Sequence, residues 1–512
     1  MKGTLLLTSL ERLWHTAPAD LWERLLPLLG YDPAQPLLFN SALFLFALAL
    51  FYIGYALLTH RRHTALRLLY VTLFSYWMYY RNAGPYILLL ALLTIAVYLL
   101  AIGMDRQQRQ GPRRAWLVVC VLLLLGGLAY FKYTAFFLTS ILPLFTGQAH
   151  EGVDLLVPLG ISFYTFQTLS YVVDVYRRQM PATRRLLDFA FFVSFFPTLL
   201  SGPILRARTF LPQLRARVEV TREMFGAGLW MLFTGLFKKC VLSDYIGENF
   251  VNRVFDNPAL YTGIENLAAL YGYTLKIYCD FSGYSDMAIG LALWMGLSIP
   301  DNFRAPYKSY SITDFWRRWH ISLSFWLRDY LYIPLGGNRC KAWRMYANQM
   351  ITMLLGGLWH GASWNFLVWG GAHGLALCVH KTWRRLLHRD KHYEPRGLRR
   401  FCATLLTFHV VALCWLFFAN STFQASITML SKIGTELHPE LLPQFLAGYP
   451  AVVSLIVLGY VLHFLPTSWN DGTRCLICRA PFLVQLLLMA IAILLVMQVM
   501  GSDVQPFIYL QF

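Results

Sequence analysis

Long apolar stretches separated by short polar loops are the main pattern along the 512-residue chain. A helix needs about 20 apolar residues to cross the ~30 Å hydrocarbon core of a membrane, and the longest stretches approach that length. They cover residues 42–58, 84–103, 115–130, 225–242, 347–369, 403–418, 449–465 and 481–500. Shorter or interrupted stretches lie at 64–80, 133–146, 153–172, 187–205, 264–297 and 311–335. The pattern predicts an all-α polytopic integral membrane protein with roughly 11 crossing helices and several partial ones.

One region departs from this pattern. Residues 275–345 place many charged side chains, including Asp280, Asp286 and Arg328, between apolar segments. Backbone that is not regular helix can lie at membrane depth only where it is buried in protein or lines a cavity. The region therefore predicts a core of broken helices around a cavity.

Composition supports a membrane protein, because 57% of the residues are hydrophobic and only 14% are charged, with a mean hydropathy of +0.48. The net charge of +18 comes largely from short loops between the apolar stretches. The most basic loops are residues 60–63, 105–114, 176–185 and 381–400. Such loops are typical of cytoplasmic ends and of contact with anionic membrane lipids, and they do not indicate nucleic-acid binding. We therefore expect the 381–400 loop to face the cytoplasm.

The N-terminus predicts a separate segment. By the same rule, the 42–58 stretch ends in the cytoplasm and residues 1–40 lie outside. Residues 1–28 mix leucines with charged side chains, which predicts an amphipathic interfacial helix without a removable signal peptide. We expect an N-terminal extension over residues 1–37 and one membrane domain over residues 38–512.

Two histidines in apolar surroundings are the leading candidates for chemistry, because an ionisable group at membrane depth is costly and usually functional. His320 lies in the segment SITDFWRRWHISLSFWLRDYLYIPLGGNR. If residues 312–327 form one helix, Trp316, His320 and Ser324 share one face. This spacing fits a polar catalytic site and a structural core histidine equally well.

The second histidine, His360, lies in MLLGGLWHGASWNFLVWGGAHG. No charged residue occurs between Arg344 and His373, and a neutral imidazole suits a general base. Glycines around His360 allow backbone or a ligand to approach closely. The candidates for the wall of a substrate tunnel at the two histidines are Trp316, Ser324, Trp359, Ser363, Trp364 and Asn365.

His373 is a weaker candidate. It follows His360 by 13 residues, which places it about 220° away around a continuous helix. The two histidines would face one cavity only if the helix broke, for which the Gly370–Gly371 pair is the expected position.

Motifs for other chemistries are absent from the sequence. It contains no phosphate-binding loop, no GxSxG nucleophile motif and no HExxH zinc motif, so we expect no metal. The two aspartates of DFSGYSD, residues 280–286, could form an acid pair or a metal site, although a structural turn in the core is favoured. Cys475 and Cys478 form a single CxxC, and zinc would need two more ligands.

Several further blocks occur in a recognisable order. They are LLFNS at 37–41, VPLGISFYTFQTLSYVVDVYR at 157–177, FFPTLLSGPI at 195–204, DFSGYSDMAIG at 280–290, PDNFRAPY to GGNR at 300–339, GLWHGASWNFLVWGGAHG at 357–374 and PFIYLQF at 506–512. Together these blocks resemble the membrane-bound O-acyltransferase (MBOAT) superfamily, and within it the bacterial alginate O-acetyltransferase type. The extension over residues 1–37 has no counterpart in the family pattern.

The resemblance implies a ring of helices around a funnel, with a tunnel that joins a cytoplasmic donor entrance to an outward acceptor face. It implies that His360 is the main catalytic residue and that His320 is the second essential position. It further implies an acetyltransferase of the bacterial inner membrane in exopolysaccharide biosynthesis, such as alginate biosynthesis. Acetyl-CoA would be the donor, with no bound cofactor. A periplasmic SGNH-type acetyltransferase or a relay protein, together with the polysaccharide acceptor, would be the partners.

Two alternative functions are considered, and the residues around His360 also predict which acyl group is used. D-alanyl transfer to teichoic acid would use a carrier protein as the donor. A proton-coupled transporter should show broken helices at matching positions in two halves, and only one such region is evident. Around His360, the side chains of Trp359, Trp364 and Trp369 predict a narrow slot that selects a small acyl group.

Overall fold

The computed structural model describes residues 29–33, 36–60, 63–148, 151–390, 393–499 and 507. Within these residues every regular element is a helix, which confirms the predicted all-α fold. The amphipathic helix expected over residues 1–28 lies outside the described residues, as does most of the expected extension over residues 1–37.

The helices fall into three successive groups along the chain. The first group is α3 (Ala42–His60), α4 (Thr64–Ala83), α5 (Ile87–Arg106), α6 (Gln110–Phe136), α7 (Pro143–Thr146), α8 (Ile161–Tyr176), α9 (Leu186–Ser194), α10 (Phe196–Leu199) and α11 (Ala207–Leu214). The second is α12 (Arg222–Leu236), α13 (Asn252–Asp256), α14 (Gly263–Trp294), α15 (Ile312–Arg318), α16 (Ile321–Leu327), α17 (Ala342–His360) and α18 (Trp364–Leu386). The third is α19 (Gly397–Ala419), α20 (Phe423–Thr435), α21 (Leu442–Gly448), α22 (Pro450–Phe464), α23 (Thr467–Arg479) and α24 (Phe482–Val499).

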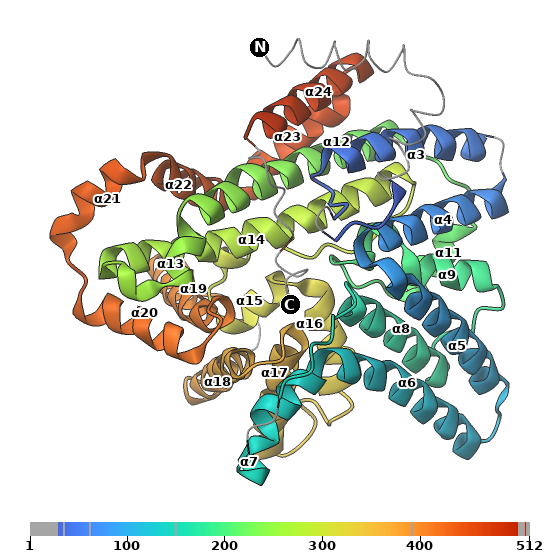
Figure 1. Cartoon of the computed structure of the whole chain (residues 1–512), viewed down its shortest axis with the longest axis horizontal. Coiled ribbons are helices and arrows are strands. Elements are labelled where there is room, and N and C mark those ends of the chain that lie inside the picture. The colour runs from blue at the N-terminus through green and yellow to red at the C-terminus, as the bar shows by residue number, and fades with distance from the viewer. Residues whose placement is uncertain are drawn as a thin grey trace.

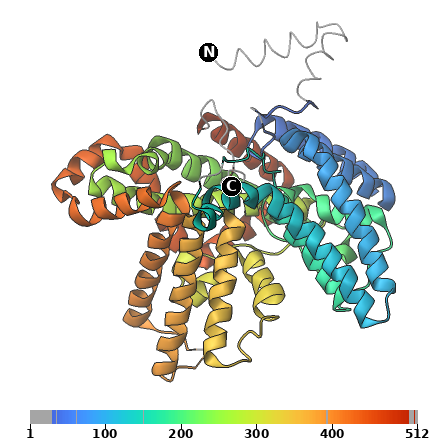
Figure 2. The same cartoon turned by 60° about the horizontal axis from the view of Figure 1, so that its bottom comes forward.

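Helices α12 and α14 pack along each other through the middle of the molecule (Figure 1). The N-terminal helices α3–α6 form one flank of this pair and α19–α22 form the other. The segment from α15 to α18, yellow to orange, extends from between the two flanks (Figure 2). The segments that carry the candidate histidines therefore lie at the centre of the fold.

Five stretches of the described chain are long and apolar enough to cross a membrane, and the number rises to seven if two bent helix pairs each form one span. This is fewer than the roughly 11 spans predicted from the apolar stretches. The five are Leu43–His60, Thr64–Arg106, Gln110–Thr146, Arg222–Asp256 and Gly397–Ala419. In Leu43–His60 and Gln110–Thr146, only 22% of the residues in the most apolar 18-residue part are buried. Most side chains of these two stretches therefore face outward, as contact with lipid requires.

Other apolar stretches do not meet this test of helix length and composition. The 347–369 stretch breaks after His360, and α14 carries charged side chains within its 32 residues. The segment Pro439–Gly448 meets α22 at a bend of 99°. The figure of roughly 11 crossings therefore stays a prediction.

The motif DFSGYSD, expected to form a turn, lies instead within the continuous helix α14. Its aspartates are held by two consecutive lysines of the π-helical segment η3 (Phe237–Asp244), which continues α12. Lys239 pairs with Asp280 at 2.7 Å and Lys238 pairs with Asp286 at 2.6 Å. A Cβ at Gly235 would lie only 2.6 Å from the Gly283 carbonyl oxygen, so glycine permits the close approach that these pairs need. Each carboxylate therefore balances an ammonium group.

Three of the basic loops, at residues 105–114, 176–185 and 381–400, lie at one end of the molecule. Hydrogen bonds connect the loops near residues 108, 177, 329 and 381. These bonds run from Arg178 Nη2 to the Gln108 carbonyl (3.4 Å), from Arg177 Nη1 to the Asp329 carbonyl (3.2 Å) and from Lys381 Nζ to the Tyr332 hydroxyl (3.2 Å). Because short basic loops are retained in the cytoplasm, we expect this common end to be cytoplasmic.

A pair of introduced cysteines tests this topology. Leu387→Cys lies in the 381–400 loop, whereas Phe145→Cys lies in α7, beyond the far end of α6. The 27 residues of α6 span about 40 Å, enough to separate the two positions across a membrane. In spheroplasts whose exposed Cys402 and Cys475 are replaced by serine, a membrane-impermeant maleimide should modify position 145 and leave position 387 unmodified. The reverse labelling pattern would invert the topology.

Candidate active site

His320 lies at a break between two short helices. Helix α15 ends at Arg318 and α16 begins at Ile321, so the expected single helix over residues 312–327 is wrong. The backbone of His320 adopts a φ of 43°, in the left-handed region that residues with a side chain rarely occupy. Consequently Trp316, His320 and Ser324 do not share one helix face.

An extended segment replaces the helical hydrogen bonds at this break. The Ile321 N–H donates to the Asn302 carbonyl at 3.0 Å, and the Arg304 N–H donates to the Arg318 carbonyl at 3.0 Å. The break is therefore fixed by pairing with residues 302–304, which are distant enough in sequence that helical periodicity could not reveal them.

The side chain of Asn302 orients the imidazole of His320. Its Oδ1 accepts the Ser322 N–H at 3.2 Å and the Ser322 hydroxyl at 2.9 Å, and it lies 3.2 Å from His320 Nδ1. A backbone N–H can only donate, so the amide oxygen of Asn302 must face this group. His320 Nδ1 therefore carries a hydrogen and donates a hydrogen bond to Asn302 Oδ1. In the neutral ring, Nε2 then keeps the lone pair.

His360 is the last residue of α17, which packs closely against α18. A Cβ at Gly357 would overlap the Phe366 carbonyl, and one at Gly370 would overlap the Met353 carbonyl, so these positions require glycine. The chain turns between Gly361 and Ser363. Helix α18 continues unbroken through Gly370 and Gly371, where a break was expected.

The two breaks bring the two histidines together in a buried, aromatic environment. His320 is 0% exposed and His360 is 3% exposed, and their ring centroids are 6.4 Å apart. Both can therefore act on one small reacting group placed between them. The surrounding rings are Trp359 (4.9 Å from His360), Trp369 (5.0 Å from His360), Phe418 (5.3 Å from His360) and Phe281 (4.7 Å from His320).

Of the predicted wall residues, Trp359 takes the expected place and Trp364 does not. Trp364 is 46% exposed and packs on Phe136. Asn365 is buried, and its amide donates to the Asn420 carbonyl at 2.7 Å, which joins α18 to the end of α19.

The remaining predicted wall residues are partly exposed. Trp316 contacts Trp369, with ring centroids 5.8 Å apart. Ser324 donates to the Trp319 carbonyl at 3.2 Å. Ser363 precedes α18 as its N-terminal cap residue. Trp316 therefore reaches the aromatic wall indirectly, whereas Ser324 serves the turn that follows His320.

His373 is closer to the site than helical geometry suggested. Its ring is fully buried and lies 4.9 Å from Trp369, which also contacts His360 at 5.0 Å. The prediction assumed one continuous helix through His360 and His373. The break after His360 removes that assumption, and Trp369 separates the two imidazoles.

Sequence reasoning missed Asn302 and Lys132. Lys132 in α6 donates to the carbonyls of Trp359 at 2.7 Å and His360 at 2.9 Å. A signal existed for each. Lys132 is a lone charge between the apolar stretches 115–130 and 133–146, and Asn302 lies in the PDNFRAPY block.

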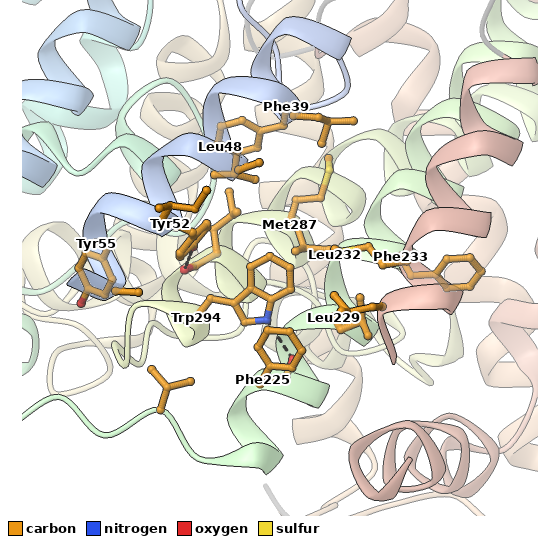
Figure 3. Close-up of a pocket in the computed structure, with 18 of the residues that line it drawn as sticks. Phe39, Leu48, Tyr52, Tyr55, Phe225, Leu229, Leu232, Phe233, Met287 and Trp294 are labelled. Atoms are coloured by element: carbon orange, nitrogen blue, oxygen red, sulfur yellow. Dashed lines mark hydrogen bonds between the residues drawn. The ribbon is translucent and has the colours of Figure 1, made fainter. Parts of the chain in front are cut away.

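A cavity of about 840 Å³ lies elsewhere, between α3, α12, α14 and α24 (Figure 3). Its lining is almost entirely apolar, and its Tyr52 and Trp294 donate to backbone carbonyls at 2.7 and 2.9 Å. Neither His320 nor His360 lines it. In the described part of the chain, no group of three or more His, Cys, Asp or Glu residues could hold a metal ion. The histidine pair therefore remains the candidate catalytic site.

Comparison with known proteins adds independent information. The model of the family described as "MBOAT, membrane-bound O-acyltransferase family" matches residues 73–423, which include both histidines. The chain is 39% identical to the probable alginate O-acetylase AlgI of Pseudomonas aeruginosa, over 83% of this chain and 80% of that protein. It is 35% identical to the peptidoglycan O-acetyltransferase of Helicobacter pylori, over 77% and 79% of the two chains. It is 30% identical to the teichoic acid D-alanyltransferase of Bacillus subtilis, over 59% and 83%.

The orientation of His320 can be tested at Asn302. Asn302→Leu keeps a similar volume but removes the acceptor of the His320 Nδ1 proton. We expect acyl-transfer kcat to fall by up to about 100-fold, the cost of misplacing a catalytic group by ~1 Å. Ser285→Ala removes only the 3.3 Å hydrogen bond that Asn302 Nδ2 donates to the Ser285 hydroxyl. The kcat of this variant should stay within a few-fold of wild type. Equal turnover of Asn302→Leu and wild-type protein would contradict this assignment.

Proposed function

The chain belongs to the membrane-bound O-acyltransferase family, and from this premise we propose that it passes acetyl groups from a cytoplasmic donor across the inner membrane for O-acetylation of an extracytoplasmic polysaccharide. The resemblance drawn from the sequence motifs is thereby confirmed, and the protein is an O-acyltransferase. Family membership gives no support to the proton-coupled transporter considered as an alternative.

The observation that carries the proposal is the juxtaposition of His320 and His360, two buried imidazoles with centroids 6.4 Å apart. In the proposed reaction, His360 removes the proton of the acceptor hydroxyl as its oxygen attacks the thioester carbonyl. The new C–O bond forms, the C–S bond breaks, and the leaving thiolate takes the proton back from His360. Donor and acceptor supply every atom of this exchange.

The hydrogen bond from His320 to Asn302 supports a distinct role for His320. With Nδ1 protonated, Nε2 of the neutral ring can accept a hydrogen bond but cannot donate one to the acyl carbonyl. His320 would therefore hold the acceptor hydroxyl or assist its deprotonation. This geometry favours assistance to proton transfer over orientation of the acyl carbonyl.

The relatives support the polysaccharide part of the proposal. One is described as a probable alginate O-acetylase and another as a peptidoglycan O-acetyltransferase, and each aligns with more than three quarters of this chain. Acetyl-CoA is the proposed donor, since the gathered basic loops suggest a cytoplasmic face that favours an anionic donor. A periplasmic SGNH-type acetyltransferase or a relay protein would receive the acetyl group before the polysaccharide does.

A second candidate is D-alanyl transfer, favoured by the similarity to the teichoic acid D-alanyltransferase of Bacillus subtilis. Its donor would be a carrier protein instead of a coenzyme. Acetyl release from labelled acetyl-CoA by the purified protein, without a carrier protein, would support acetyl transfer. Release that occurs only from a D-alanyl carrier protein would support the alternative.

His360→Ala is the direct test of the proposed chemistry. Loss of general base catalysis should lower kcat by about 10²–10⁴-fold, while the purified variant keeps its thermal unfolding midpoint. His409→Ala in α19 is a suitable control, because His409 bonds only the Leu405 carbonyl of its own helix, at 2.7 Å, and should keep full turnover. Wild-type turnover in His360→Ala would refute the proposal.

The site should also select a small acyl group. The rings of Trp359, Trp369 and Phe418 lie within 5.3 Å of the His360 ring, so they would restrict the size of an acyl group bound beside it. An added methylene changes selectivity by only about 1–3 kcal/mol, so propionyl-CoA should react slowly and palmitoyl-CoA should be excluded sterically. An acyl-CoA series compared by kcat/KM tests this expectation. Equal use of acetyl and palmitoyl donors would indicate a lipid-acylating enzyme.

A further inference from the structure

A lysine lies at membrane depth and touches the backbone beside the catalytic histidine. Lys132 belongs to α6, within the candidate span Gln110–Thr146, and is only 8% exposed. A buried ammonium in a lipid-facing helix is costly, so its position calls for a specific partner. The acyl-transfer chemistry proposed above does not use it.

Lys132 has three hydrogen-bond partners among the described residues. Its Nζ donates to the Trp359 carbonyl at 2.7 Å, the His360 carbonyl at 2.9 Å and the Ser162 hydroxyl at 3.3 Å. An ammonium group has three N–H donors and no acceptor. All three are engaged, so Lys132 has no donor to offer a substrate.

Two of these acceptors are carbonyls at the end of α17. The last carbonyls of a helix have no partner within it and carry the negative end of the helix dipole. The neighbouring Tyr133 donates to the Leu358 carbonyl at 2.8 Å, so one turn of α6 holds three successive carbonyls of α17. Water would usually satisfy these groups in a soluble protein, but hydrocarbon cannot.

We infer that Lys132 is a positioning residue for His360: its ammonium group fixes the C-terminal end of α17 and thereby sets where the His360 imidazole stands relative to His320. A cation at the C-terminal end of a helix is electrostatically favourable, and two strong hydrogen bonds fix the carbonyls in direction. His360 is itself one of the two residues whose carbonyls Lys132 binds. A small rotation of the helix end would therefore move the imidazole away from the reacting atoms.

The experiment compares Lys132→Met with Lys276→Met. Methionine keeps the length and apolar character of the lysine stem and removes the three donors. Lys276 is the control, because it is also a lysine on a helix and is partly buried, and its Nζ bonds the Asn252 side chain at 2.5 Å instead of the backbone at His360. For each purified full-length protein, kcat, the KM for acetyl-CoA and the thermal unfolding midpoint are measured.

We expect Lys132→Met to lose about 10–100-fold in kcat, as a catalytic group misplaced by ~1 Å would. Its KM should stay within about threefold of wild type, and its unfolding midpoint should match that of Lys276→Met. A kcat within threefold of wild type would overturn the inference. A loss of kcat that accompanies an equal rise in KM or a unique drop in the unfolding midpoint would also overturn it, because a general structural role predicts those changes.

The inference rests on the proposed function, and the two fail differently. If acetyl-CoA is not the donor, wild-type protein shows no turnover and the proposed function fails. If wild-type protein is active and His360→Ala is as active as wild type, the catalytic assignment fails. If His360→Ala is inactive while Lys132→Met turns over normally, only the role of Lys132 is refuted.

Discussion

Every backbone polar group that leaves helical geometry inside a membrane must find a partner within the protein, and this constraint shapes the whole centre of the molecule. Two such departures exist at the candidate site, one at His320 and one after His360. At the first, Asn302 supplies its backbone carbonyl and its side chain. At the second, Lys132 and Tyr133 supply three hydrogen bonds. The geometry of the proposed site is therefore held by polar residues that need not touch a substrate.

The same rule governs the charges of the central helix pair. Lys239 is 1% exposed and contacts both Asp280 and Asp244, while Lys238 contacts Asp286. Removing one member of such a buried pair typically costs about 3–5 kcal/mol, because it leaves an uncompensated charge. These pairs join α12 to α14 in one register. That register holds α14 against the extended segment through Ser285, which accepts from Asn302 at 3.3 Å.

How much the sequence could predict depended on the range of each interaction. Helical content follows from local composition and was confirmed, and the two histidines selected from their apolar surroundings lie side by side in the structure. The break at His320 was not predicted, because the residue that supplies its hydrogen bonds, Asn302, lies 18 positions away in the sequence. Trp364 looked like a wall residue, but the turn at Gly361–Ser363 directs it outward to 46% exposure. Lys132 was passed over because its partners, Trp359 and His360, are more than 225 positions distant.

The left-handed backbone of His320 shows what this architecture must tolerate. A non-glycine residue in that region costs about 1–3 kcal/mol and persists only where its surroundings impose it. Glycine would adopt the same φ without strain, and asparagine would tolerate it, but neither provides an imidazole. The imidazole stands at the point where the chain turns, and there its ring centroid lies 6.4 Å from that of His360. Asn302 offsets the strain by accepting the Ile321 N–H at its backbone carbonyl and the Ser322 N–H at its side-chain Oδ1, and Oδ1 also fixes which ring nitrogen of His320 carries the proton. The strain and the orientation of the imidazole are therefore consequences of one local arrangement.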